Sequence, residues 1–163
     1  MLPRCIVGVL LCVIATDGSA DPVRVALPGF QCTGMAQSVR LPSKLSQLRQ
    51  LGRVTHEQVV HTQEWDGYKA VEKLIRFEGM RLRVVTFTND PEKYSLSGAD
   101  IESSAWNLSP FPIGQPIRAA VSRLGVTNPA SNAVWQFSGE SESLYLESRK
   151  GKVFRVVYEC DTG

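Results

Sequence analysis

Apolar and polar residues alternate through the middle of the chain with the two-residue period of a β-strand. Residues 71–77 alternate in this way, which places Ile75 and Phe77 on one face of a strand. The pattern breaks at residues 78–80 and resumes over residues 81–89, which are rich in Val, Thr and Phe. Two such runs around a short break that contains glycine predict a β-hairpin.

Further extended runs surround this hairpin on both sides. Residues 92–106 are predicted to form a pair of strands around a turn at Ser97-Gly98. In the last run of the chain, Phe154, Val156 and Tyr158 share a face with Cys160. The remaining runs that predict strands are residues 53–65, 134–138, 144–149 and 153–160.

A helix is predicted over residues 114–125. Pro116 suits the first turn of a helix, and Ile117, Val121 and Leu124 follow at the spacing of one helix face. Gly125 stands where a left-handed residue commonly ends a helix.

A second, shorter helix is predicted over residues 43–52. Ser43 is its expected N-cap, and Gly52 is expected to end it. Its apolar positions are Leu45, Leu48 and Leu51. A helix this short depends on packing against other elements for its stability.

The first twenty residues have the pattern of a secretory signal peptide. Arg4 provides a positive charge, residues 5–15 are apolar or small, and a short polar segment leads to Ala20. A membrane anchor is a weaker interpretation, because eleven apolar residues in a helix span about 16 Å and a bilayer core is about 30 Å thick. Neither Cys5 nor Cys12 follows a residue suited to lipoprotein cleavage. We therefore expect an exported chain, in the periplasm or outside the cell, with no membrane span after residue 20.

Residues 21–163 are expected to form a single domain of the α+β class. The elements predict a mainly antiparallel sheet with one or two short helices packed on one face. Their order is also compatible with a domain made of two diverged copies of one unit, each a helix followed by strands. Hydrophobic residues make up 43% of the chain, which is enough to build a core rather than a disordered segment. The formal net charge of +2 argues against a nucleic-acid partner.

Export leaves Cys32 and Cys160 as the two cysteines of the mature domain. In an oxidising compartment these two cysteines are expected to form one intramolecular disulfide. Two free thiols or an intermolecular bridge are the alternatives. A disulfide would make a nucleophilic cysteine improbable, because its sulfur atoms carry no thiolate.

The chain carries no recognisable catalytic, metal or cofactor motif. His56 and His61 are five residues apart, which places them on opposite faces of a regular strand and supplies too few ligands for zinc. The segment around Ser141 lacks the final glycine of a nucleophile elbow and is expected to be a polar turn. No phosphate-binding glycine motif is present. We therefore predict no cofactor, no metal site and no assigned catalytic residue.

Aromatic side chains in predicted turns are the remaining candidates for a functional surface. Trp65 and Tyr68 surround one turn, and Trp106 and Phe111 flank another polar segment. Trp and Tyr dominate the energetics of recognition surfaces, although most such rings belong to a core. We take these four residues as candidate binding residues.

The second half of the chain resembles a family of exported bacterial domains. Residues 114–125 read G-x-P-I-x-x-A-V-x-x-L-G, and strands containing Trp135-Gln136-Phe137, residues 144–147 and residues 151–153 follow. This order resembles the repeat unit of β-lactamase inhibitor protein-like and outer-membrane small-lipoprotein domains, over about 50 residues. The family includes inhibitors, assembly-complex lipoproteins and other periplasmic proteins. The resemblance therefore implies a fold and an exported location but no single function.

Two classes of function remain from the sequence. The first is an exported, non-enzymatic binding or inhibitory module that engages a protein or a cell-envelope partner. The second is a hydrolase whose site is assembled from dispersed residues, and a structural role in envelope assembly is a further alternative. The missing catalytic motifs and the expected disulfide favour the first.

Overall fold

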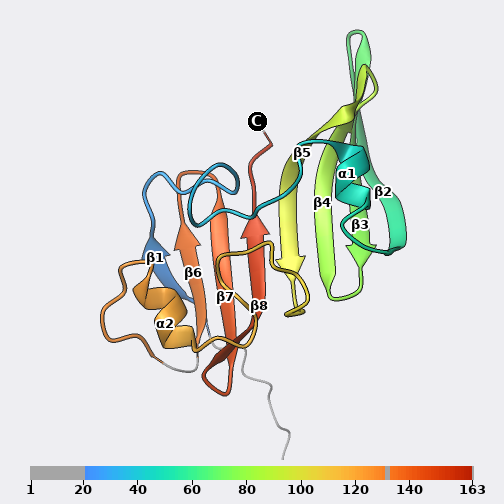
Figure 1. The fold of residues 1–163 in the computed structure, drawn as a ribbon. Helices are drawn as coiled ribbons and strands as arrows, with labels where there is room; N and C mark the ends of the chain where they lie inside the picture. Colours follow the sequence, from blue (N-terminus) through green and yellow to red (C-terminus); the bar gives the residue numbers. More distant parts are fainter. Residues whose placement is uncertain (1–20, 131–132, 163) are drawn as a thin grey trace, which may run out of the picture.

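The computed structural model describes residues 21–130 and 133–162, which form one eight-stranded sheet and two short helices. The strands lie across the sheet in the order β1-β6-β7-β8-β5-β4-β3-β2 (Figure 1). Neighbouring strands are antiparallel except β1 and β6, which are parallel. In chain order the elements are β1 Val23–Ala26, α1 Leu45–Arg49, β2 Val54–Trp65, β3 Tyr68–Phe77, β4 Met80–Phe87, β5 Asp90–Ile101, α2 Ile117–Ser122, β6 Val134–Ser138, β7 Ser143–Arg149 and β8 Lys152–Glu159.

Two halves of the chain meet in the middle of this sheet. Helix α1 is followed by the strands β2 to β5, and helix α2 is followed by β6 to β8. The last strands of the two halves, β5 and β8, pair with each other over residues 98–101 and 156–159. Each helix contacts the last strand of its own half. The predicted α+β class with a mainly antiparallel sheet is therefore confirmed, while common descent of the halves stays a prediction.

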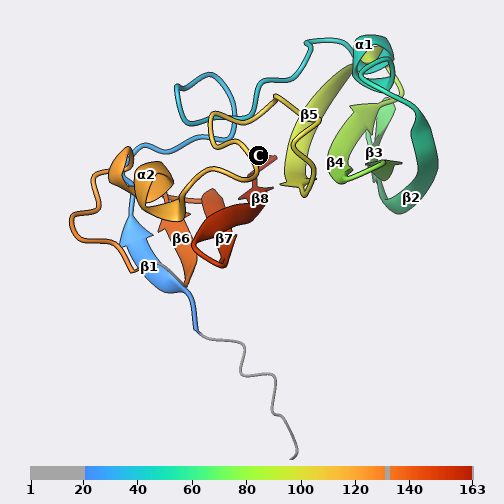
Figure 2. The same ribbon diagram turned by 60° about the horizontal axis from the view of Figure 1, so that its bottom comes forward.

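Both helices and the long connecting loops lie on one side of the sheet (Figure 2). We call this side the core face, because its alternate strand residues are buried beneath the helices and loops. The opposite side carries the other set of alternate residues and has no described element over it, and we call it the open face. The most deeply buried large side chains of the core include Leu48, Ile75, Leu82, Ile117, Phe137, Leu146 and Tyr158.

The predicted hairpin is present as β3 and β4, and Ile75 and Phe77 are buried on the core face as the alternation indicated. The strand pair predicted over residues 92–106 is wrong, because β5 runs without a turn through Ser97-Gly98. A shift of register between Arg83 and Val84 marks a bulge here. A Cβ atom at Gly98 would lie 3.2 Å from the carbonyl oxygen of Tyr158. The glycine therefore permits the close approach of β8 rather than a turn.

Helix α2 has the predicted apolar face, since Ile117, Val121 and Leu124 are all buried. Gly125 has φ +84°, the left-handed conformation predicted for the residue that follows a helix. The helix is shorter than predicted, because Pro116 is extended and forms an isolated bridge with Lys152 of β8. Pairing with the sheet thus replaces the first expected helical turn.

Helix α1 also lies within its predicted range, with Leu45 and Leu48 buried. The prediction that Ser43 caps this helix is wrong, because Lys44 occupies the N-cap position and no side chain caps it. Gly52 follows the helix, and a Cβ atom there would lie 2.7 Å from the Trp106 ring. Packing of Trp106 therefore requires a residue without a side chain at this position.

The predicted disulfide between Cys32 and Cys160 is present, and it joins the loop after β1 to the residue after β8. Strand β1, which pairs in parallel with β6, was not predicted. Phe154 does not share the core face with Val156 as expected, because a bulge in β8 displaces it and the Arg149 guanidinium covers its ring.

The predicted signal peptide, residues 1–20, lies outside the described residues. No helix in the described ranges is long and apolar enough to cross a membrane.

Candidate binding site at the β2–β3 hairpin

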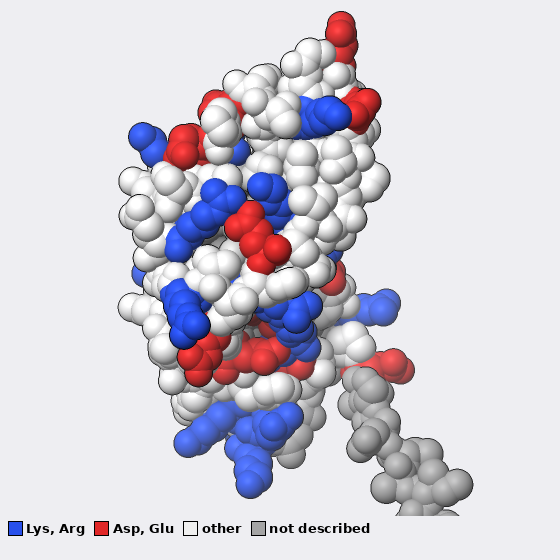
Figure 3. Space-filling model, turned by 90° about the vertical axis from the view of Figure 1, so that its right-hand side faces the viewer, with Lys and Arg blue, Asp and Glu red and all other residues white. Residues whose placement is uncertain are grey.

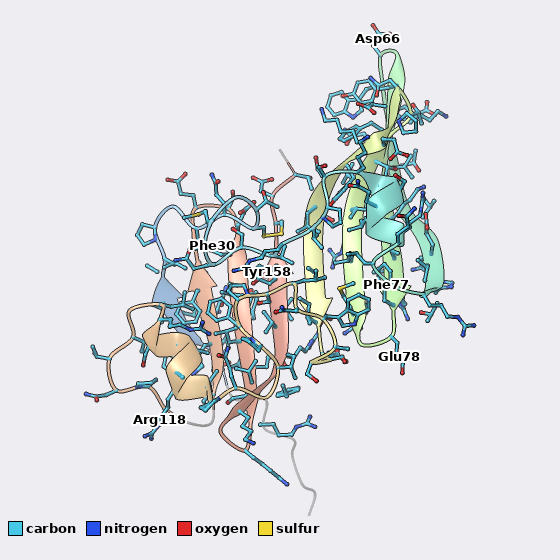
Figure 4. The ribbon with its side chains drawn as sticks, in the orientation of Figure 1. Phe30, Asp66, Phe77, Glu78, Arg118 and Tyr158 are labelled. Carbon is cyan, nitrogen blue, oxygen red and sulfur yellow. A yellow bond between two sulfur atoms is a disulfide. The ribbon has the colours of Figure 1, made fainter. Side chains whose placement is uncertain are left out.

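The β2–β3 hairpin ends in a two-residue turn formed by Asp66 and Gly67. Gly67 has φ +84°, a conformation that glycine adopts without strain. The hairpin extends beyond the rest of the sheet, and Asp66 lies at its far tip, at the opposite end from Glu78 (Figure 4). Trp65 and Tyr68 are direct partners across the two strands immediately below this turn.

The rings of Trp65 and Tyr68 stack with their centroids 6.4 Å apart and their planes 10° apart. Phe87, at the end of β4, adds a third ring whose centroid lies 6.2 Å from that of Tyr68. Lys93 of β5 places its ammonium group 5.6 Å from the Phe87 centroid. Trp65 has 53% of its surface exposed, and no other large hydrophobic residue that is exposed in the described part of the chain is aromatic. We call Trp65, Tyr68 and Phe87 the aromatic tip.

A hollow of about 240 Å³ lies beside the aromatic tip on the open face. Its lining includes the three rings of the tip together with the polar side chains of His61, Gln63 and Glu72. Strand pairing places these groups together, because His61 is the direct partner of Glu72 and Gln63 is the direct partner of Ala70. Sequence reasoning found the two rings beside the turn but missed Phe87 and the polar groups, which only the strand register brings alongside.

Trp106 and Phe111, the other candidate binding residues, do not join this site. Phe111 is 2% exposed and belongs to the core. Trp106 is partly buried, packs edge-on against Phe77 with a centroid distance of 5.4 Å, and donates its indole N–H to the carbonyl oxygen of Glu78. Both rings therefore support the loops that cover the core face.

The centre of the open face carries a network of ion pairs. Asp100 on β5 accepts hydrogen bonds from Arg81 and from the Nε and Nη2 atoms of Arg155. Arg155 also donates to Glu147 at 3.0 Å, and Arg81 donates to Glu102 at 2.8 Å. The hydrogen bonds to Asp100 raise the pKa of Arg155 above its ordinary value. Each of these charges already has a partner, so the network fastens β4, β5, β7 and β8 together.

Charged side chains of both signs are mixed on the flank of the molecule that β2 borders (Figure 3). Basic side chains alone gather at the lower end of this view. The β7–β8 turn lies at that end of the molecule in Figure 1, and it carries the exposed residues Arg149, Lys150 and Lys152. No large patch of charged side chains of a single sign covers this flank in the view of Figure 3.

The two histidines lie on the same face of β2, contrary to the prediction for a regular strand. His56 is the partner of Arg76 and His61 is the partner of Glu72, and these two β3 residues share the open face. The register shift between Val59 and His61 inserts one residue and turns His61 to this face. His56 lies 3.0 Å from the Gln58 amide oxygen. Within the described ranges, no group of three or more His, Cys, Asp or Glu side chains is arranged to hold a metal ion.

The polar groups that could suggest a hydrolase have structural partners. Ser109 lies 2.9 Å from the Tyr158 hydroxyl, and Tyr158 donates to the carbonyl oxygen of Gln37, so this buried pair connects β8 to two loops. Burial raises the pKa of the Tyr158 hydroxyl above its ordinary value. Glu142, in the predicted polar turn, accepts the backbone N–H of Cys32.

Three carboxyl groups in the described part of the chain have a shifted pKa, and in each of them the pKa lies below its ordinary value. A hydrogen bond from Arg49 lowers the pKa of Glu57, one from Lys69 lowers that of Glu64, and one from the Ser46 hydroxyl lowers that of Glu92. A general acid that works at neutral pH needs the opposite shift. These three carboxylates therefore serve as ion-pair and hydrogen-bond acceptors.

Comparison of the chain with models of protein families, with curated proteins and with solved structures gave no match. The resemblance of the second half to β-lactamase inhibitor protein-like domains therefore stays a prediction. Functional inference for this chain rests on the geometry of its own residues.

Proposed function

We propose that this protein is an exported, non-enzymatic binding module that engages a protein or a cell-envelope partner through the aromatic tip of its β2–β3 hairpin. The observation that carries the proposal is the exposure of Trp65 at the end of a hairpin that extends beyond the sheet. Exposing a large aromatic ring to water is unfavourable, and such rings are typical anchors of recognition sites.

The arrangement of the rings favours binding over a purely structural role. A stacked pair across a hairpin stabilises its two strands, but Trp65 keeps about half of its surface free after it has stacked on Tyr68.

Export is supported by two features. The first is the signal-like pattern of residues 1–20. The second is the Cys32–Cys160 disulfide, a bond that persists in oxidising compartments. Mass spectrometry of material recovered from the periplasm or the medium is expected to show a chain that begins at Asp21 and reacts with no thiol reagent.

A photo-crosslinking residue in place of Asp66 tests the binding function. After irradiation in a cell-envelope extract, we expect crosslinked products whose yield falls at least ten-fold in the Trp65→Ala/Tyr68→Ala background. A crosslinker at Lys150, on the β7–β8 turn at the other end of the molecule, is the matched control and is expected to give none of these products. If the products are the same with and without the two rings, the aromatic tip is not the binding surface.

A further inference from the structure

A small residue, Ala70, stands among larger ones in the lining of the hollow beside the aromatic tip. Gln63, Ala70 and Phe87 are successive partners across β2, β3 and β4, so their side chains stand in one row on the open face. The Ala70 methyl group is far smaller than the side chains of Gln63 and Phe87, and all three residues line the hollow. The volume of about 240 Å³ is below the roughly 300–1,000 Å³ of pockets for drug-sized ligands, so it suits a single ring rather than a bulky cofactor.

One end of the hollow is aromatic. The nearly parallel planes of Trp65 and Tyr68 and the tilted ring of Phe87 line that end. The face of an aromatic ring is electron-rich and attracts the weakly positive hydrogen atoms of C–H groups. A flat ligand with C–H groups on one face therefore fits against Trp65 at this end.

Polar side chains line the rest of the hollow. His61 and Glu72 face each other directly across β2 and β3, one row below Gln63. The Oε1 atom of Glu72 accepts the Ser97 hydroxyl at 3.2 Å and lies 3.9 Å from Nε of Arg83, and a carboxylate offers about four acceptor positions in all. The Gln63 amide provides two donor hydrogens and an acceptor oxygen. These three side chains therefore offer directional donors and acceptors to a ligand rich in hydroxyl groups.

We infer that the hollow binds one pyranose ring of a neutral saccharide, whose C–H face stacks on Trp65 while its hydroxyl groups bond to Gln63, His61 and Glu72. A pyranose combines one apolar face with a rim of hydroxyl groups, which is the combination that this lining complements. The described lining contains the Glu72 carboxylate and no Lys or Arg, and the neighbouring Arg83 guanidinium is engaged with that carboxylate at 3.9 Å, so the lining favours an uncharged sugar over a phosphorylated or sulfated one. The inference rests on the proposed function, because both use Trp65 and Tyr68.

Titration of the purified protein with neutral oligosaccharides tests this inference. The probes are tetramers of glucose, N-acetylglucosamine, galactose and mannose, and the measurements are calorimetry and tryptophan emission. Binding of at least one tetramer is expected with a Kd at or below about 1 mM, a weak affinity that suits a single-ring site. Trp65→Ala is expected to weaken that affinity at least ten-fold, and Gln63→Ala several-fold.

Glu64→Gln is the matched control for these variants. Glu64 lies between Gln63 and Trp65 in the sequence but on the opposite face of β2, where it pairs with Lys69. We expect this variant to bind the saccharide as the unaltered protein does. Binding that is equal in Glu64→Gln, Gln63→Ala and Trp65→Ala would place the saccharide elsewhere and overturn the inference.

The crosslinking experiment at Asp66 separates this inference from the proposed function. If no tetramer binds but a protein is crosslinked in a Trp65-dependent manner, the saccharide is wrong and the binding module stands with a protein partner. If a tetramer binds through Trp65 and Gln63, both proposals stand. If no tetramer binds and no Trp65-dependent product forms, both are wrong.

Discussion

At the scale of single residues, Glu57 shows how one carboxylate connects two elements. Its oxygens accept hydrogen bonds from the Nε and Nη2 atoms of Arg49, at 3.1 and 2.8 Å, and the Lys73 ammonium lies 3.5 Å away. Arg49 ends helix α1, while Glu57 and Lys73 lie on β2 and β3. The three charges therefore hold the helix against the edge of the sheet.

Glu57→Gln is expected to lower stability in a pH-dependent manner. The hydrogen bond from Arg49 lowers the pKa of Glu57 below its ordinary value of 4.5, so the ion pair stabilises the fold above that pH. This contribution is lost as the pH falls through the folded-state pKa. At pH 7 we expect a loss of at most about 1 kcal/mol, because both side chains are partly exposed.

Urea unfolding of Glu57→Gln and of the unaltered protein between pH 7 and pH 3 measures the difference in their free energies of unfolding. This difference is expected to disappear at the acid end of the range. Glu78→Gln removes the charge of an exposed carboxylate in the β3–β4 turn and is the control for the substitution itself. A gap for Glu57→Gln that stays constant with pH would show that the carboxylate charge is not the cause.

At the scale of elements, both helices depend on the sheet for their existence. Helix α1 has five residues and α2 has six, far fewer than the roughly 12–15 that an isolated helix needs to be stable in water. Neither helix has a side-chain cap. Their stability comes from buried apolar contacts, such as those of Leu48 in α1 and Val121 in α2.

Val121→Asp is expected to destabilise the protein by several kcal/mol. Val121 is fully buried in α2, and a carboxylate there would lose its hydration without gaining a partner. Ala119→Asp places the same side chain on the exposed face of the same helix and is the control, with an expected change below about 1 kcal/mol. Thermal and urea unfolding measure the stability of the two variants. Equal melting temperatures for Val121→Asp and Ala119→Asp would contradict the burial of the Val121 face of α2.

The elements also show where alternation is a sufficient guide and where it is not. Residues 71–77 alternate regularly, and the strand and its buried face are as predicted. Alternation gave the wrong face for His61 and for Phe154, because an inserted residue in β2 before His61 and a bulge in β8 at Phe154 interrupt the alternation of faces along each strand. Bulges arise from how a strand fits its neighbour, so they leave little trace in the strand's own residues.

At the scale of the whole molecule, the disulfide joins distant parts of the chain. Cys32 follows β1 at one edge of the sheet, and Cys160 follows β8 in the middle, 128 residues later. The backbone N–H of Cys160 also donates to the carbonyl oxygen of Ser97 on β5, at 3.1 Å. This end of the molecule therefore connects the loop after β1 with the junction of the two halves.

Cys32→Ser/Cys160→Ser is expected to lower the free energy of unfolding by about 2–5 kcal/mol. A loop of this length restricts the unfolded chain by about 4–5 kcal/mol in the chain-entropy model. Urea unfolding of the variant, and of the unaltered protein with and without reductant, measures the effect. The reduced protein and the variant are expected to unfold at the same urea concentration, and a variant as stable as the oxidised protein would contradict the expected contribution of the bond.

The sequence alone determined the fold class, the hairpin of β3 and β4, the buried face of α2 and the pairing of Cys32 with Cys160. The first three features depend on local periodicity, and the disulfide was predicted from a signal-like pattern that would remove Cys5 and Cys12 and leave one intramolecular pairing. Tertiary structure decided the order of the strands, the continuity of β5 and the different surroundings of four aromatic residues that looked alike. Trp65 and Tyr68 face a hollow with Gln63, while Trp106 and Phe111 pack into the protein, because exposure depends on which strands and loops become neighbours.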